Sequence, residues 1–273
     1  MKSQVRPLPR LMVAPNGARR GPSDHPALPL TDDALIETAI ACQQAGADGI
    51  HLHLRDDAGR HLLDAGRYQI LLDRLADETP TKYLQVTSEA AGVYEPDEQR
   101  AMIRQLRPAH VSVALREMLR KPEDGPTARD FYHWASDNGV AIQHILYTPD
   151  EVRAFVDACE RDLIPGPAWQ LIFVQGSYAT GADETVLLEQ FLQPLVDAGR
   201  LSQTDWMVCA FGKQETACLV RAAELGGKAR VGFENSLWNA DGTVARDNAE
   251  RVREVHNALI EFEKSGKPGA VDQ

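Results

Sequence analysis

Features of several familiar protein classes are absent from this sequence of 273 residues. Its four cysteines show no C-x-x-C spacing and fall inside expected helices or strands, which indicates packed, reduced thiols rather than a disulfide framework. No apolar run reaches the length that crosses a bilayer, and residues 1–10 lack the apolar core of a signal peptide. We therefore expect a cytoplasmic protein.

Basic residues are also scarce, since 29 Lys and Arg stand against 40 Asp and Glu, for a net charge of -11. Nucleic acids and anionic membranes both bind basic faces, so this balance argues against either partner. An anionic small substrate is not excluded, because it needs only a local basic pocket.

What the chain does contain is a regular alternation of short β-rich runs and amphipathic helical stretches. The expected strands are 11–14, 49–55, 83–87, 110–115, 141–147, 169–174, 206–211 and 229–234. The expected helices are 32–45, 65–76, 96–106, 127–138, 150–161, 184–198, 214–225 and 245–263. Thr31 is placed to cap the first helix.

Eight such units predict one domain, residues 1–273, folded as an α/β protein of the eightfold (β/α) TIM-barrel type, with a loose tail after about residue 264. The strands read as near-continuous apolar runs, which is typical of a parallel sheet covered on both faces. An open doubly wound sheet is the alternative. Its usual G-x-G-x-x-G first turn is missing, because residues 14–18 read Ala-Pro-Asn-Gly-Ala.

Two histidines, His51 and His53, lie one residue apart in the expected strand 49–55. Side chains two residues apart on a strand point to the same side, so the two imidazoles can share a metal ion. Zinc favours nitrogen ligands of this kind. The pair alone leaves two interpretations open, a metal site or two hydrogen-bonded histidines of the core or its rim.

A carboxylate, Glu234, ends the expected strand 229–234. In a closed barrel this strand neighbours the first, which neighbours the second, and barrel enzymes build their sites at the carboxyl ends of strands. Glu234 can therefore join the two histidines in a site with an open position, the pattern of catalytic zinc. Taken singly, it is as readily a solvated loop carboxylate. Arg230 lies four residues before Glu234, so on a strand both side chains point to the same side. We therefore expect Arg230 to face the interior, either in an ion pair or in catalysis.

Seven short segments, spread from about residue 11 to about residue 260, form a recognisable series. They are Ala14-Pro15-Asn16-Gly17-Ala18, Pro26-x-Leu28-Pro29-x-Thr31, Ala45-Gly46-Ala47, His51-Leu52-His53-Leu54-Arg55-Asp56, Gln85-Val86-Thr87-Ser88, Gly226-Gly227-x-x-Arg230-Val231-Gly232-Phe233-Glu234-Asn235 and Asn248-Ala249. In this order they resemble the β-keto acid cleavage enzymes, whose prototype cleaves 3-keto-5-aminohexanoate.

The resemblance implies a zinc-dependent barrel that condenses a β-keto acid with acetyl-CoA to give acetoacetate and a new acyl-CoA. It implies that His51, His53 and Glu234 hold one zinc ion per chain, which polarises the keto and carboxylate oxygens and spreads the enolate charge. It also implies a homo-oligomer, a dimer or a tetramer, with small molecules as its other partners.

The chain departs from the family pattern at the general base. The prototype has an Asp after its metal-binding Glu, linked to Arg and Ser in proton transfer, whereas this chain has Asn235, whose amide cannot act as a base at neutral pH. Arg230 is retained, and Thr87 stands where the serine hydroxyl would be, with Ser88 next to it. Glu89 replaces a glycine and is our candidate substitute base, with an exposed loop acid as the alternative.

Substrate contacts are expected from loops at the same end of the barrel. The positions are Asn16, Arg19, Arg116, Gly176, Ser177 and Lys213. Arg19 stands where the prototype has a Glu that handles a cationic amino group. A positive residue at that position indicates a neutral or anionic substrate tail, unless Arg19 is simply a surface residue.

The CoA side is expected in the loop 175–181, which includes Gly176 and Ser177 and matches the location of a glycine-rich CoA-facing segment. Lys213 opens the next helix, where its charge and the free helix N–H groups can meet a CoA phosphate, unless it is simply a surface lysine. Arg116 either lines the pocket or pairs with Glu117.

Two other functions remain open. The same ligands could serve a metal-dependent hydrolase or an aldolase-type lyase, although the further His ligands and carboxylated lysine of a dinuclear hydrolase are not found. The protein could also be a barrel that only binds a keto acid or a CoA ester, and Asn235 is the feature that keeps this alternative open.

Overall fold

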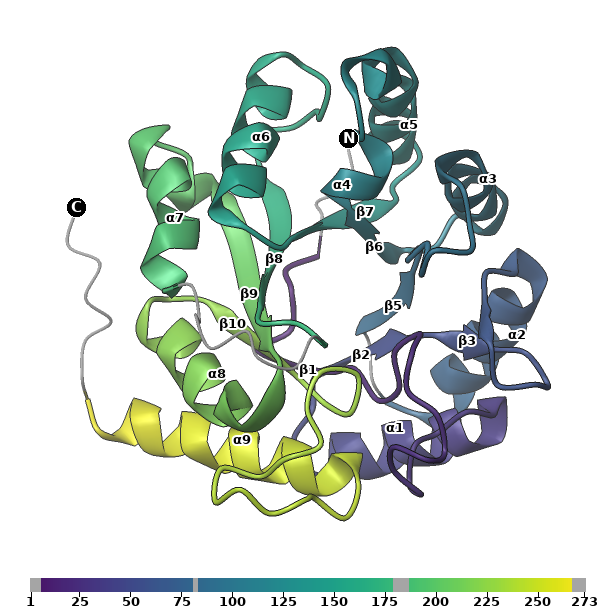
Figure 1. Cartoon of the computed structure of the whole chain (residues 1–273), viewed down its shortest axis with the longest axis vertical. Coiled ribbons are helices and arrows are strands. Elements are labelled where there is room, and N and C mark those ends of the chain that lie inside the picture. The colour runs from purple at the N-terminus through teal and green to yellow at the C-terminus, as the bar shows by residue number, and fades with distance from the viewer. Residues whose placement is uncertain (1–5, 81–82, 179–186, 267–273) are drawn as a thin grey trace.

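Eight parallel strands close a barrel in the computed structural model, which describes residues 6–80, 83–178 and 187–266 (Figure 1). The strand order around the barrel is β1-β10-β9-β8-β7-β6-β5-β2. The barrel strands are β1 (Leu11–Val13), β2 (Gly49–Leu52), β5 (Tyr83–Thr87), β6 (His110–Ala114), β7 (Ala141–Leu146), β8 (Trp169–Gln175), β9 (Thr204–Ala210) and β10 (Lys228–Val231). The predicted fold class is confirmed.

A ring of helices surrounds the barrel in Figure 1. They are α1 (Asp32–Gln44), α2 (Ala65–Glu78), α3 (Pro96–Leu106), α4 (Leu115–Met118), α5 (Gly125–Asp137), α6 (Pro149–Glu160), α7 (Leu188–Asp197), α8 (Glu215–Glu224) and α9 (Asn248–Lys264). Because α9 packs beside both α1 and α8, the last helix closes the ring against the first. None of the helices that the structure describes is long and apolar enough to cross a membrane.

Side chains alternate between two apolar layers, as the strand period of two requires. In β8, Leu171 and Phe173 belong to the layer shared with the helices, whereas Ile172 and Val174 fill the barrel interior. Both layers are buried, which explains why the strands read as continuous apolar runs.

Two expected strands end three residues early, and both of these ends lie at the site. The expected strand 49–55 stops at Leu52, and Leu54–Arg55 forms β3, which pairs antiparallel with β4 (His61–Leu62) outside the barrel. The expected strand 229–234 stops at Val231, because Gly232 takes a φ of +138° and passes close to the carbonyl of Ala14. Glu234 therefore lies in a turn, and the strand parity assumed for it was wrong.

Helix ends agree with the sequence to within a few residues. Thr31 accepts a hydrogen bond from the Ala34 N–H and caps α1 as expected. α9 begins at Asn248 rather than at residue 245, because Asp247 is its N-cap. The expected start of the helix 184–198 and the tail beyond Gly266 lie outside the described residues. All four cysteines are free thiols, as expected.

Candidate metal centre

His51, His53 and Glu234 converge at the carboxyl end of the barrel. The Nε2 atoms of the two histidines are 3.1 Å apart. Glu234 Oε2 lies 3.6 Å from His51 Nε2 and 3.3 Å from His53 Nε2. His51 is on β2, His53 follows that strand, and Glu234 is on the turn after β10; both strands flank β1. The three side chains that the sequence placed together are therefore neighbours.

A chain of amides orients the first histidine. His51 Nδ1 lies 2.8 Å from Gln85 Oε1, and Gln85 Nε2 donates to Gln143 Oε1 at 3.0 Å. Because the amide oxygen of Gln85 can only accept, the network assigns the proton to His51 Nδ1 and leaves a lone pair on Nε2. Burial lowers the pKa of His51 to about 3, so the ring is neutral at pH 7. A neutral, hydrogen-bonded imidazole is the form that binds a metal.

The carboxylate is shared between an arginine and the histidines. Glu234 Oε1 accepts from Arg230 Nη2 at 2.8 Å, while Oε2 faces the two imidazoles. Burial alone would raise the pKa of Glu234, but Arg230 first, and then the histidines, hold it well below its usual range. The donor set is therefore two imidazoles and one carboxylate, and these residues fit zinc.

Arg230 forms the ion pair that was one of its two expected roles. Its Nη2 also donates to Asn235 Oδ1 at 3.1 Å, and both residues are buried. Asn235 thus supplies a neutral acceptor to the arginine that contacts Glu234. It does not contribute a charge.

Glu89 lies at the edge of the centre. Its Oε2 is 3.9 Å from His53 Nδ1 and its Oε1 is 3.8 Å from Arg19 Nε. Burial raises the pKa of its carboxyl group. Thr87 Oγ1 accepts from the Glu89 N–H at 3.0 Å and so fixes the start of this loop. Ser88 donates its hydroxyl to the Ser112 carbonyl instead.

The remaining expected positions lie in the segments that follow barrel strands, and Arg116 is in the short helix α4. Asn16 is buried and donates to the carbonyls of Pro29 and His53, so its amide joins two loops. Arg116, after β6, covers the Tyr147 ring at 3.7 Å and pairs with Glu151, not with Glu117.

Among the residues expected to contact CoA, Lys213 is exposed and follows β9. Its Nζ lies 4.6 Å from the centre of the Trp238 ring. Gly176 and Ser177 are exposed after β8. The part of the expected loop from 179 to 181 lies outside the described residues.

Other residues of the site carried little or no signal in the sequence. Ser112 faces the barrel interior, and its hydroxyl has no hydrogen-bond partner among the described residues. Tyr147 also packs inward, whereas His144 points out between Tyr132 and Phe155.

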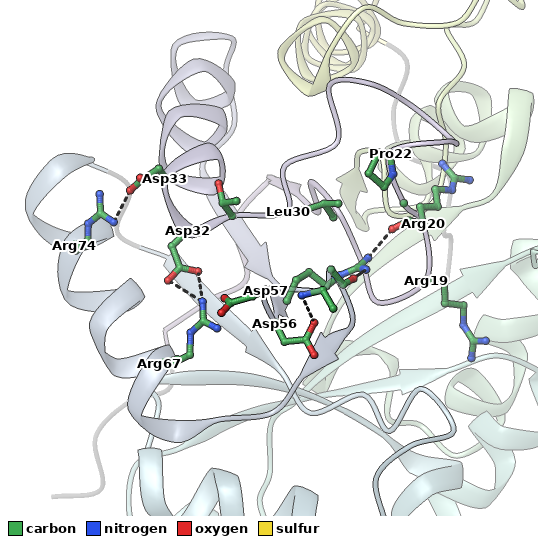
Figure 2. A pocket seen from close by; sticks show the side chains of 15 residues that line it. Arg19, Arg20, Pro22, Leu30, Asp32, Asp33, Asp56, Asp57, Arg67 and Arg74 are labelled. Carbon is green, nitrogen blue, oxygen red and sulfur yellow. Dashed lines mark hydrogen bonds and ion pairs between the residues drawn. The ribbon is translucent and has the colours of Figure 1, made fainter.

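A cavity of about 690 Å³ lies between the loop after β1, the β3–β4 hairpin and helices α1 and α2. In Figure 2, Asp32 with Arg67 and Asp33 with Arg74 form one side, and Arg19 and Arg20 lie across from them. The cavity lining does not include the three metal-centre residues.

Comparison with known proteins gives matches over nearly the whole chain. A family model described as beta-keto acid cleavage enzyme matches residues 10–266. The 3-keto-5-aminohexanoate cleavage enzyme of Acetoanaerobium sticklandii is 25% identical over 93% of this chain and 91% of its own. The 3-oxoadipate:acetyl-CoA acetyltransferase of Cupriavidus necator is 25% identical over 95% of this chain and 90% of its own.

Solved structures share the fold. The ternary complex of ObcA with C4-CoA adduct and oxalate superposes with a TM-score of 0.66 at 16% identity, over 87% of this chain. This chain spans about two thirds of the length of ObcA, 65%. A type I 3-dehydroquinate dehydratase from Clostridium difficile gives 0.60 at 11% identity, over 96% of this chain and 94% of its own.

Proposed function

Because this chain belongs to the β-keto acid cleavage enzyme family, we propose that it condenses a β-keto acid with acetyl-CoA and releases acetoacetate and a new acyl-CoA. The Cupriavidus necator relative supports the choice of co-substrate, since its name includes acetyl-CoA. The observation that carries the proposal is the convergence of His51, His53 and Glu234 at the carboxyl end of the barrel.

The centre is proposed to hold one zinc ion. His51 Nε2, His53 Nε2 and Glu234 Oε2 would be its ligands, and Gln85 would keep His51 in the ligating tautomer. Bound zinc would supply a Lewis acid for the keto and carboxylate oxygens of the substrate. Two nitrogen donors favour zinc over magnesium, which prefers oxygen ligands.

Glu89 is proposed to be the general base. It would take the proton from the carbon between the keto and carboxylate groups, and the carbanion then attacks the acetyl thioester. The CoA thiolate released in that attack adds to the former keto carbonyl, and a retro-Claisen step breaks the bond between that carbonyl and the central carbon to give the new acyl-CoA. The carbanion left on the central carbon takes back the proton held by Glu89 and leaves as acetoacetate. The raised pKa of Glu89 makes it a stronger base than an exposed carboxylate, and Arg19 beside it limits where the side chain can lie.

Substrate selection is assigned to the loops around the centre. The Arg19 side chain is 56% exposed, so it can meet an anionic substrate tail. The CoA portion is proposed to lie across Gly176, Ser177 and Lys213, with Arg116 at the rim. The free thiols fit a cytoplasmic enzyme, and a homo-oligomer is proposed on the family resemblance alone.

A substrate screen tests the proposal. Purified protein is incubated with acetyl-CoA and β-keto acids that carry neutral, cationic or anionic tails, and acyl-CoA products are identified by mass spectrometry. Acetoacetate and a new acyl-CoA should appear together, and only when both substrates are present. Acetoacetate formed without acetyl-CoA would indicate a hydrolase or lyase. Binding without turnover would indicate the keto acid or CoA-ester binder that Asn235 leaves open.

A further inference from the structure

The turn that carries Glu234 is held through its backbone by side chains from two other loops. Arg20 donates from Nη1 to the Phe233 carbonyl at 2.8 Å and from Nη2 to the Asn235 carbonyl at 3.1 Å. The Tyr178 hydroxyl donates to the carbonyl of Glu234 itself at 2.7 Å. Three successive carbonyls, centred on a proposed metal ligand, are therefore each bonded from outside the turn.

A buried arginine, Arg55, in turn holds the backbone of Arg20 in position. Arg55 donates from Nη2 to the Arg20 carbonyl at 2.9 Å, and from Nε to the Gly17 carbonyl, also at 2.9 Å. Its Nη1 donates to the Gly59 carbonyl at 2.7 Å. Arg55 is 3% exposed, so this guanidinium joins the loop after β1 to the β3–β4 hairpin and does not face solvent.

The same loop also touches the Glu234 side chain. Gly17 has a φ of +63°, and a Cβ added there would lie 2.6 Å from Glu234 Cγ. The backbone at Gly17 is thus the surface against which the glutamate side chain packs. Arg55 fixes the position of that surface through the Gly17 carbonyl.

Arg19 and Arg20, in the loop after β1, make different contacts. Figure 2 shows the side chains of Arg19 and Arg20 leaving the loop in different directions. Arg19 points toward Glu89, whereas Arg20 reaches the turn after β10. Arg20 also lies 5.6 Å from the centre of the Tyr178 ring, so the two donors to the turn contact each other.

We propose that Arg20, seated by Arg55, is a positioning residue that sets the place of Glu234 Oε2 relative to the two histidine nitrogens, and thereby sets metal affinity. We call Arg20, Arg55 and Tyr178 the turn brace. The proposal rests on the metal centre of the proposed function, but it does not depend on the reaction or on the identity of the base.

The test measures metal binding rather than turnover. Apo protein is titrated with zinc in competition with a chromophoric chelator, and the visible spectrum of the cobalt form reports ligand geometry. Arg20→Gln should weaken zinc binding by about 10–100-fold, the usual effect of losing an outer-shell partner, and should shift the cobalt spectrum. Arg20→Lys should fall between this variant and the original protein, since one amine cannot reach both carbonyls.

The matched control is Arg74→Gln. Arg74 lines the same cavity but pairs with Asp33 and Glu78, so zinc affinity and the cobalt spectrum should stay as in the unsubstituted protein. Should Arg20→Gln fail to fold, Arg20→Lys and Tyr178→Phe decide the question by the same two readouts.

Unaltered zinc affinity and an unaltered cobalt spectrum in the folded Arg20 variants overturn the brace while leaving the metal centre intact. Failure of the unsubstituted protein to bind zinc overturns the metal centre, and the brace with it.

Discussion

The buried pair of Arg230 and Glu234 gives a quantitative prediction about stability. The two side chains are 4% and 11% exposed, and Arg230 Nη2 lies 2.8 Å from Glu234 Oε1. In metal-free protein, Glu234→Gln leaves a charged guanidinium buried with only neutral partners, namely the introduced amide, the Asn235 amide and the Cys209 thiol. We expect this variant to lose about 3–5 kcal/mol of unfolding free energy, the usual cost of breaking a buried pair.

The separation of the two groups supports this magnitude. At 2.8 Å and an effective dielectric constant of about 20, the attraction amounts to about 6 kcal/mol. The hydrogen bond from Arg230 to Asn235 survives and offsets part of the loss. In the double variant Arg230→Met with Glu234→Gln, neither charge is left unpaired. The double variant should therefore lose about 2–3 kcal/mol less than the sum of the single variants.

The assay is urea unfolding of EDTA-treated protein, followed by far-ultraviolet circular dichroism at pH 7. The control cycle uses Arg74→Met and Asp33→Asn, whose Nη1–Oδ1 distance is also 2.8 Å but whose side chains are 40% and 79% exposed. Its coupling should stay below about 1 kcal/mol, because solvent screens the pair. Equal coupling in the two cycles, or additivity within about 0.5 kcal/mol at Arg230 and Glu234, would refute the reasoning.

Three other predictions concern single side chains. His51→Ala should remove most of the zinc found by elemental analysis, about one ion per chain in the unsubstituted protein; full retention would show that His51 is not a ligand. Glu89→Gln should lower kcat by about 100-fold or more with zinc content unchanged, and a normal kcat would eliminate it as the base. His144 is buried neutral, with its pKa lowered from 6.5 to about 3 by desolvation. Between pH 6.5 and about 3, the unfolded chain therefore binds more protons than the folded protein. The free energy of unfolding falls as pH falls through this range, by up to about 1.4 kcal/mol per pH unit. His144→Phe should flatten the profile between pH 6 and 4, and an unchanged slope would contradict this.

Much of the fold was readable because it depends on local pattern. The apolar run at 169–174 is buried on both faces, as a covered parallel sheet requires. Thr31 caps α1 through a hydrogen bond from the N–H three residues later. The wrongly predicted strand end is one that a backbone group distant in the sequence determines. Gly232 ends β10 because the chain there passes the Ala14 carbonyl, which lies more than two hundred residues earlier.

The sequence by itself determined the pair of histidines, because His51 and His53 are neighbours in the chain and side-chain period brings them together. It also brought Glu234 near them, through the order of strands in a closed barrel. Only the tertiary structure decided how Glu234 is held. Arg20, Arg55 and Tyr178 bond to backbone carbonyls, which every residue possesses, so no residue type at positions 17, 20, 233, 234 or 235 signals these contacts.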